Sequence, residues 1–291
     1  MTALLGLVRA LRPRQWTKNL LVFAGLVFTY NLANPQMLVR VGGAFLVFCA
    51  LSSAGYLWND IRDAVADRQH PIKRYRPIAA GVVGIPLAGT VSFGLSLAGL
   101  VFAGTLGVPF TLVAAAYAAL TVLYSLVLKH VVLIDVFAIA AGFVLRAVGG
   151  AVVIGVPVSP WLYVCTVLVS LFIALGKRRH ELQLLADDAS RHRPILSQYS
   201  EELVDQLILI VAAATIIAYS LYTFSAENLP RDHSMMLTIP FVVYGVFRYL
   251  FLVRMRGGGG APDEMLLTDR GLLATAVSWV LACLAILYVA R

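Results

Sequence analysis

Charged residues are scarce in this chain. Asp, Glu, Lys and Arg make up 13% of its 291 residues, whereas about a quarter is usual for a soluble domain. Hydrophobic residues reach 60%, and the mean hydropathy is +0.85. This shortage of charge excludes an ordinary soluble domain. It predicts an all-α integral membrane protein in which residues 1–291 form a single polytopic domain.

Cysteine is also rare. The three cysteines, Cys49, Cys165 and Cys283, each lie within an apolar run. No Cys-x-x-Cys pair occurs and no His stands near a cysteine at ligand spacing. The sequence therefore predicts neither a disulfide framework nor a zinc site.

Apolar runs of about 17 to 25 residues are long enough to cross a bilayer as helices. Turn signals such as Asn34-Pro35 and Gly107-Val108-Pro109 separate the runs in this chain. We expect nine transmembrane helices, at roughly 17–33, 37–60, 84–105, 108–129, 131–155, 159–182, 203–224, 235–255 and 271–290.

Basic residues are unevenly divided between the two ends of such a bundle. With the N-terminus inside, 18 of the 23 Lys and Arg fall on the inner side. The positive-inside rule then places the N-terminus and the loops near 61–83, 183–202 and 256–270 in the cytoplasm, with Arg291 outside. Because these basic residues lie at bilayer edges, they do not support nucleic-acid binding. We expect a multi-pass protein of a bacterial plasma membrane, and the Ala, Val, Gly and Arg usage suggests an actinobacterial source.

Acidic residues also favour the inner side, where a polar, cytoplasm-facing pocket is expected. Of the 15 Asp and Glu, only Glu227 and Asp232 fall on the outer side. Orientation alone requires Lys and Arg but no acids. The cytoplasmic face is therefore where a functional site is predicted.

The first candidate pattern closes the second run: Asn59-Asp60-x-x-Asp63-x-x-x-Asp67. If the helix continues, Asn59, Asp63 and Asp67 share one face, with Tyr56 and Asp60 beside them. Three oxygen-bearing side chains on one face suit Mg²⁺ or Mn²⁺, which completes its coordination with substrate phosphate oxygens. The alternative is a solvated helix end, but acids beside a hydrophobic span are costly unless they are compensated.

Two basic patterns accompany the acids. Lys73 and Arg76 follow in a proline-stiffened loop, and residues 176–181 close the sixth run with Lys177, Arg178 and Glu181. These cations suit the phosphates of a substrate. A positive-inside loop and a favourable interaction with the helix dipole are the alternatives.

Lesser candidates lie at two other places on the inner side and within one span. Lys18 precedes the first run, and Arg270 precedes the ninth. Asp135 and Arg146 are ionisable residues inside the fifth run, eleven positions apart on one helix face. Such residues are functional candidates, although pairing with neighbouring helices also explains them.

The acidic motif on the second of nine helices resembles the UbiA superfamily of intramembrane prenyltransferases, over nearly the whole chain. Typical members carry a second aspartate-rich motif near the end of the sixth helix, where this chain has Gly176-Lys177-Arg178-Arg179-His180-Glu181. That departure resembles the branch of decaprenyl-phosphate phosphoribosyltransferases. Further matches to the branch are Arg12-Pro13-x-Gln15-Trp16-x-Lys18-Asn19, Asp67-Arg68-x-His70-Pro71-x-Lys73-x-x-Arg76-Pro77 and Leu267-Thr268-Asp269-Arg270.

The resemblance implies a magnesium-dependent enzyme with two substrates, phosphoribosyl pyrophosphate and decaprenyl or a similar polyprenyl phosphate. The product would be decaprenylphosphoryl-5-phosphoribose, a precursor for cell-wall arabinan. Lipid-facing aromatic residues leave room for a homo-oligomer.

In that reading each candidate residue has a role. Asn59, Asp63 and Asp67 hold the metal, and Asp60 orients a ribose hydroxyl or the metal shell. Lys18, Lys73 and Arg76 take up the charge of the leaving pyrophosphate, whereas Lys177 and Arg178 hold the 5-phosphate. Tyr56, Glu181 and Arg270 complete the expected substrate-binding residues.

Two other functions compete with this reading. One is a UbiA-type transfer of a prenyl group from a prenyl diphosphate to an aromatic acceptor, which the basic residues at 176–181 disfavour. The other is a polytopic transporter, whose internal repeats are not evident and whose charges would lie nearer the midplane.

Overall fold

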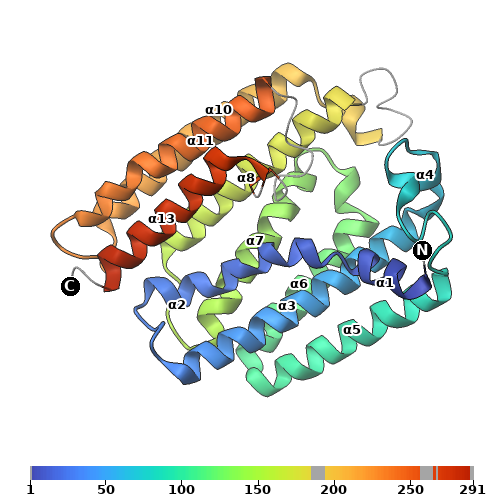
Figure 1. The fold of residues 1–291 in the computed structure, drawn as a ribbon, viewed down its shortest axis with the longest axis horizontal. Coiled ribbons are helices and arrows are strands. Elements are labelled where there is room, and N and C mark those ends of the chain that lie inside the picture. Colours follow the sequence, from blue (N-terminus) through green and yellow to red (C-terminus); the bar gives the residue numbers. More distant parts are fainter. Residues whose placement is uncertain (1, 185–193, 256–264, 267, 289–291) are drawn as a thin grey trace.

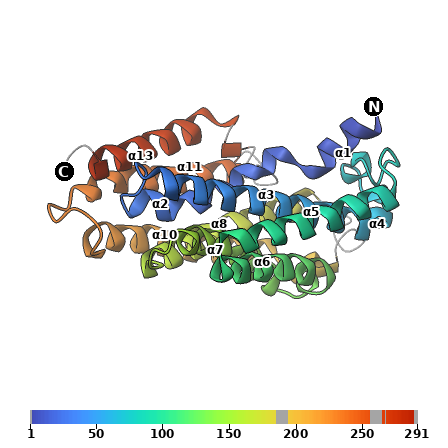
Figure 2. The same ribbon diagram turned by 90° about the horizontal axis from the view of Figure 1, so that it is seen from below.

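The computed structural model describes residues 2–184, 194–255, 265–266 and 268–288, and these residues form helices and connecting loops without a strand. Figures 1 and 2 show a bundle of long helices, edge-on in the second view. The helices are α1 (Ala3–Leu11), η1 (Pro13–Phe23), α2 (Ala24–Phe28), α3 (Pro35–Arg62), α4 (Ala64–Gln69), η2 (Lys73–Tyr75), α5 (Ile85–Leu106), α6 (Val108–Leu126), η3 (Leu128–His130), α7 (Ile134–Val153), α8 (Pro160–Leu184), η4 (Pro194–Gln198), α10 (Glu201–Ser225), η5 (Ser234–Thr238), α11 (Ile239–Met255) and α13 (Arg270–Tyr288).

Eight helical segments in the described part of the chain are long and apolar enough to cross a membrane. They correspond to the second to ninth predicted spans, so the expectation of an all-α, multi-pass membrane protein is confirmed. Much of the predicted loops at 183–202 and 256–270 lies outside the described residues.

The first predicted span, 17–33, differs from the others because it is not one α-helix. It consists of the 3₁₀ helix η1, eleven residues long, and the five-residue α2. Close packing against α7 explains its irregular backbone: a Cβ on Gly150 would lie 1.8 Å from the Val22 carbonyl oxygen. A 3₁₀ helix rises about 2 Å per residue, so the two segments together extend about 30 Å.

Local sequence sets the boundaries of several helices. Pro35 begins α3, and the side chain of Asn34 caps it by accepting hydrogen bonds from the N–H groups of Gln36 and Met37. Ser200 caps α10 in the same way through the N–H of Leu203. Gly107, at a φ of 120°, permits the abrupt reversal between α5 and α6.

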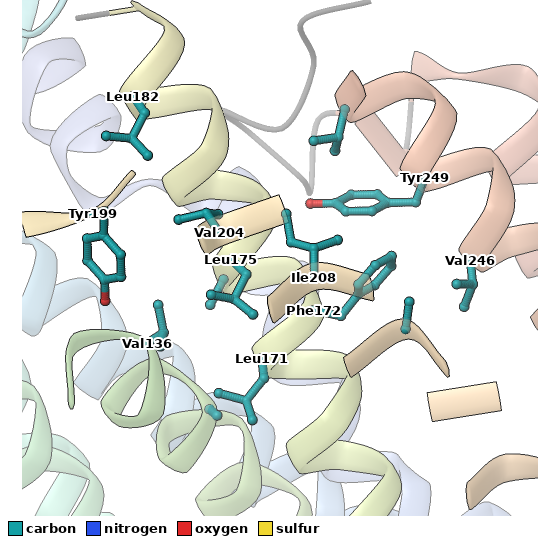
Figure 3. Close-up of a cluster of buried hydrophobic side chains, with 14 of the residues drawn as sticks. Val136, Leu171, Phe172, Leu175, Leu182, Tyr199, Val204, Ile208, Val246 and Tyr249 are labelled. Carbon is teal, nitrogen blue, oxygen red and sulfur yellow. The ribbon is translucent and has the colours of Figure 1, made fainter. Parts of the chain in front are cut away.

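Helix α7 lies at the centre of the bundle and joins two apolar cores. One core packs α3, α5, α6 and η1 against one side of α7, around Phe48 and Phe110. The other joins α7 to α8, α10 and α11 around Leu171, Phe172 and Tyr249, as Figure 3 shows. Outward residues are apolar as well, as expected for helices that face lipid.

One end of the bundle, called the polar end below, gathers the ion pairs of the described chain. It comprises the end of α3, all of α4, the end of α8 and the start of α10, at the right and top of Figure 1. The opposite end holds α2, the start of α3 and the loop between α10 and α11. The ion pairs therefore lie together, as predicted from the one-sided distribution of charge.

Candidate active site

The acidic segment does not follow one continuous helix face. Helix α3 ends at Arg62, and α4 begins at Ala64. Asp63, between them, has a φ of −90° and a ψ of 0°, a sparsely populated conformation in which active-site residues often lie. Asp67 pairs with Arg76, whereas Asn59 and Asp63 contact Lys129, so the side-chain contacts divide the segment between two clusters. The N–H of Asp67 still bonds to the carbonyl of Asp63, as in a continuing helix.

Asn59, Asp63 and Lys129 form the first polar cluster. The Asn59 amide donates to Oδ2 of Asp63 at 3.0 Å. Nζ of Lys129, which is in η3, lies 2.6 Å from Oδ1 of Asp63 and 3.4 Å from Oδ1 of Asn59. The Lys129 ammonium therefore lies between two side-chain oxygens at the end of α3.

Asp60 and Asp67 form the second cluster with two arginines. Nη1 of Arg76 donates to Asp60 at 3.1 Å and to Asp67 at 2.7 Å. Arg12, the C-cap of α1, donates to the same oxygen of Asp60 at 2.6 Å and places its guanidinium over the ring of Tyr56. Burial raises the pKa of Asp67, and Arg76 opposes that rise.

The donor atoms of the two clusters fit a hard divalent cation. They are carboxylate and amide oxygens, the ligands that Mg²⁺ prefers, and Lys129 already holds a positive charge against two of them. Within the described residues, no three Asp, Glu, His or Cys gather closely enough to enclose a metal by themselves. Mg²⁺ usually retains waters and takes the rest of its ligands from substrate phosphates, so a partial protein shell is compatible with it.

The predicted basic pattern at the end of α8 contains a buried ion-pair network. Arg178 has a side chain only 1% exposed and donates from Nε to Oδ2 of Asp135 at 2.7 Å. It also pairs with Glu181. Tyr199 donates to the other oxygen of Asp135 at 2.8 Å, and burial with this hydrogen bond raises the pKa of Tyr199 to about 12.

This network alters the expected arrangement of the pattern. Glu181 pairs with Arg178, because the buried guanidinium needs anionic partners. Lys177 is half-buried. Arg179, which follows Arg178, forms ion pairs with Asp205 and Glu201 of α10, each at 3.1 Å.

The remaining predicted residues are spread over the polar end. Lys18 bonds to Gln15, and Lys73 is half-buried in η2. Arg270 is exposed at the start of α13. Its neighbour Asp269 pairs with Arg248 at 2.8 Å, and this contact lowers the pKa of Asp269 to about 2.

Asp135 and Arg146 have separate partners despite their common helix face. Asp135 belongs to the Arg178 network, whereas Arg146 contacts Asn19 and Tyr117. Pairing with neighbouring helices, the structural alternative considered for both, is therefore confirmed for Asp135.

Lys129 and Arg12 were not among the predicted site residues. Lys129 was counted only toward the positive-inside asymmetry, whereas Arg12 also opens one of the motifs that carry the resemblance to the branch. The available signal for Lys129 was its position as a lone cation closing an apolar run, level with the acids at the end of α3.

Residues 19–268 match the model of the UbiA prenyltransferase family. The chain belongs to this family. The predicted UbiA resemblance is thus confirmed, and the matched region includes the acidic segment, Arg76 and Lys129, whereas Arg12 precedes it.

Two relatives of this UbiA family member carry the name of the branch that the sequence resembles. A decaprenyl-phosphate phosphoribosyltransferase of Corynebacterium glutamicum is 36% identical over 295 residues, covering 98% of this chain and 87% of the relative. The protein of the same name from Mycolicibacterium smegmatis is 37% identical over 291 residues, covering 94% and 90%.

A solved structure supports the fold of this UbiA family member independently. The UbiA homologue from Archaeoglobus fulgidus, bound to GPP and Mg²⁺, aligns with a TM-score of 0.74 over 98% of this chain and all of its own. At 18% sequence identity, this likeness bears on the fold alone.

Proposed function

We propose that this chain transfers a 5-phosphoribosyl group from phosphoribosyl pyrophosphate to decaprenyl phosphate or a similar polyprenyl phosphate. A phosphate oxygen of the lipid forms a bond to C1 of the ribose. The bond between C1 and the pyrophosphate oxygen breaks, and its electron pair leaves with the pyrophosphate. The product, decaprenylphosphoryl-5-phosphoribose, would serve the synthesis of cell-wall arabinan.

The observation that carries this proposal is the pairing of all three acids of the segment with cations from elsewhere in the chain. Asp60, Asp63 and Asp67 contact Arg12, Arg76 and Lys129. Hard oxygen donors beside strong anion-binding groups suit a metal-bound diphosphate. The names of the full-length relatives favour phosphoribosyl pyrophosphate as that diphosphate.

We assign the metal to Asn59, Asp63 and Asp67, with Asp60 beside them. Bound Mg²⁺ or Mn²⁺ would supply positive charge to the leaving pyrophosphate. Arg76, Lys129, Lys73 and Lys18 contribute further cationic charge. The ionised lipid phosphate needs no general base, so positioning and electrostatics dominate the rate enhancement.

The 5-phosphate is assigned chiefly to Lys177. Arg178 was predicted to share this role, but Asp135 and Glu181 engage its guanidinium within the protein. We therefore assign Arg178 to holding the ends of α7 and α8 together. Tyr56 and Arg270 stay as proposed contacts at the edges of the site.

A cytoplasmic polar end is consistent with this chemistry, because phosphoribosyl pyrophosphate is soluble and highly charged. We propose that η1 and α2, about 30 Å long together, form a ninth membrane crossing. The N-terminus would then lie in the cytoplasm and the C-terminus outside a bacterial plasma membrane. A lateral approach from the bilayer would spare the polyprenyl chain from crossing water.

A transfer assay tests the function directly. Purified protein in nanodiscs is incubated with Mg²⁺, radiolabelled phosphoribosyl pyrophosphate and decaprenyl phosphate, and label is extracted into organic solvent. We expect lipid-linked label, lost at least about a hundredfold in Asp63→Ala. Arg40→Gln, at the opposite end of the bundle, is the control.

The same preparation separates the alternatives. Transfer from a prenyl diphosphate to an aromatic acceptor, with no label on lipid phosphate, would overturn the proposed substrates. Movement of phosphoribosyl pyrophosphate into sealed vesicles without any covalent product would point to transport instead.

A further inference from the structure

Arg146 is a buried cation in the middle of α7, with 6% of the residue exposed. Its Nε donates to Oδ1 of Asn19 at 2.6 Å, and Nη2 donates to the hydroxyl of Tyr117 at 2.6 Å. Nη1 donates to the carbonyl of Gly142 at 2.9 Å. All three protein partners are electrically neutral.

The charge of Arg146 consequently has no counter-ion within the described chain. A guanidinium keeps its proton in proteins, and a buried charge is costly unless it is paired. Arg178 illustrates the usual solution, since it is buried to the same degree beside Asp135 and Glu181. An anion at Arg146 would provide the same compensation.

The hydrogen-bonding capacity of Arg146 points to the kind of anion. A guanidinium has five N–H donors, and the three partners above use one on Nε and one on each Nη. Nη1 and Nη2 each retain a second N–H, which together suit two oxygens of a phosphate. The rings of Tyr117 and Phe143, 4.7 and 5.2 Å from Cζ, fix the guanidinium in place.

Arg146 lies inside the bundle, farther from the polar end than the two acidic clusters. Its side chain runs back one turn to Gly142, toward the polar end where α7 begins. At about 1.5 Å per residue, Gly142 lies about 10 Å from Asp135 along the helix. Asn19 contacts Ser52 of α3, and Ser52 lies about 12 Å from Asp60 along that helix.

Polar residues connect the two levels. Tyr56 is one turn of α3 from Asp60, and Ser52, one turn further along α3, contacts Asn19, the partner of Arg146. A phosphate at Arg146 would therefore face the proposed diphosphate site from the bilayer side. This is the side on which the apolar chain of a polyprenyl phosphate would extend into the bilayer.

We propose that Arg146 binds the phosphate of the polyprenyl phosphate acceptor, with the Tyr117 hydroxyl beside it and Asn19 orienting the guanidinium. This inference rests on the proposed function. Arg146 holds two phosphate oxygens and leaves a third to form the bond to C1. No proton is transferred, because the phosphate is already ionised.

Steady-state kinetics with each substrate varied in turn test the assignment. In Arg146→Gln we expect the KM for decaprenyl phosphate to rise at least about tenfold, the usual effect of losing charged hydrogen bonds. The KM for phosphoribosyl pyrophosphate should stay within about twofold. Arg40→Gln, which loses an arginine bonded to backbone carbonyls at the far end of α7, should change neither value.

Two kinetic outcomes would overturn the proposal. An unchanged KM for the lipid phosphate in Arg146→Gln would show that Arg146 does not bind it. An equal rise in both KM values would identify a general structural role or a contact with the donor.

A binding measurement tests the proposed phosphate site without requiring turnover. Native mass spectrometry compares decaprenyl phosphate with decaprenol, its uncharged alcohol. We expect the wild type to prefer the phosphate at least about tenfold, and Arg146→Gln to lose that preference while Arg40→Gln retains it. Wild-type protein that shows this pattern but transfers no ribosyl group would refute the proposed function and support the site.

Folding of the variant is addressed by two milder substitutions. Arg146→Lys keeps the charge, and Tyr117→Phe removes only a hydroxyl. If Arg146→Gln does not fold, partial loss of the phosphate preference in both of these supports the proposal. Wild-type preference in both overturns it.

Discussion

The Lys129 ammonium lies 2.6 Å from a carboxylate oxygen of Asp63, joining η3 to the end of α3 across 66 positions of sequence. Asn59 contacts both residues. The pair places a permanent cation at the proposed metal–diphosphate site.

Removing the cation should weaken the binding of the diphosphate substrate. For Lys129→Met we expect the KM for phosphoribosyl pyrophosphate to rise about tenfold or more, because a charged hydrogen bond is lost. Lys129→Arg should recover part of the loss. A Lys129→Met enzyme with wild-type kinetics would remove Lys129 from the site.

Metal dependence should follow the acidic segment. In a thermal-shift measurement, Mg²⁺ with phosphoribosyl pyrophosphate should stabilise the wild type, and EDTA should abolish that shift. Asp63→Ala and Asp67→Ala should show little shift, whereas Asp232→Ala, at the far end, should behave as wild type. Retention of the full shift in both site variants would contradict the metal assignment.

Arg178 should contribute mainly to the stability of the folded protein and not to catalysis. Arg178→Gln leaves the buried Asp135 and the half-buried Glu181 without their cation, and breaking a buried ion pair costs about 3–5 kcal/mol. Thermal unfolding in detergent should report this loss, and Asp135→Asn in the same chain should restore part of it. Arg270→Gln, an exposed cation, is the matched control.

The Arg248–Asp269 pair should contribute stability only above acidic pH. The pKa of Asp269 falls from 3.8 to about 2 in the folded protein, mainly through the hydrogen bond from Arg248. Its stabilising effect is thus present above about pH 4 and is lost as the pH falls through about 2. Acid titrations of wild type and Asp269→Asn should differ above this window and converge below it.

Close packing of η1 on α7 should make Gly150 intolerant of substitution. A Cβ at Gly150 would lie 1.8 Å from the backbone oxygen of Val22, so Gly150→Ala must displace backbone. We expect a large loss of folded protein, measured by size-exclusion chromatography. Gly94→Ala, where nothing lies within 4 Å, should express normally.

Most of the fold could be anticipated from residue patterns. Long apolar runs must be helical in a bilayer, because only helices satisfy their own backbone groups there, and eight of the nine runs are such helices. The exception, 17–33, looked the same by hydropathy. Its 3₁₀ backbone depends on contact with Gly150, a residue more than a hundred positions away.

The candidate site could be predicted in part. The acidic segment was identifiable because its polar residues lie close together in sequence, directly after an apolar span: Asn59, Asp60, Asp63 and Asp67. Of their partners, Arg76 was also predicted, whereas Lys129 and Arg12 were not, since they reach the acids from other helices. Within α8, Arg178 was predicted to hold a phosphate, but Asp135 of α7 and Glu181 engage its guanidinium within the protein.

By itself, the sequence determined the bilayer environment, the helical architecture, the family resemblance and the end of the bundle that carries the charges. These follow from composition, periodicity and adjacent residues, which are local properties of a chain. Only the tertiary structure decided which cation faces which acid, where the helix breaks at Asp63, and that Arg146 lies buried with no carboxylate partner among the described residues. Those relationships depend on distances between helices, and a linear pattern does not contain them.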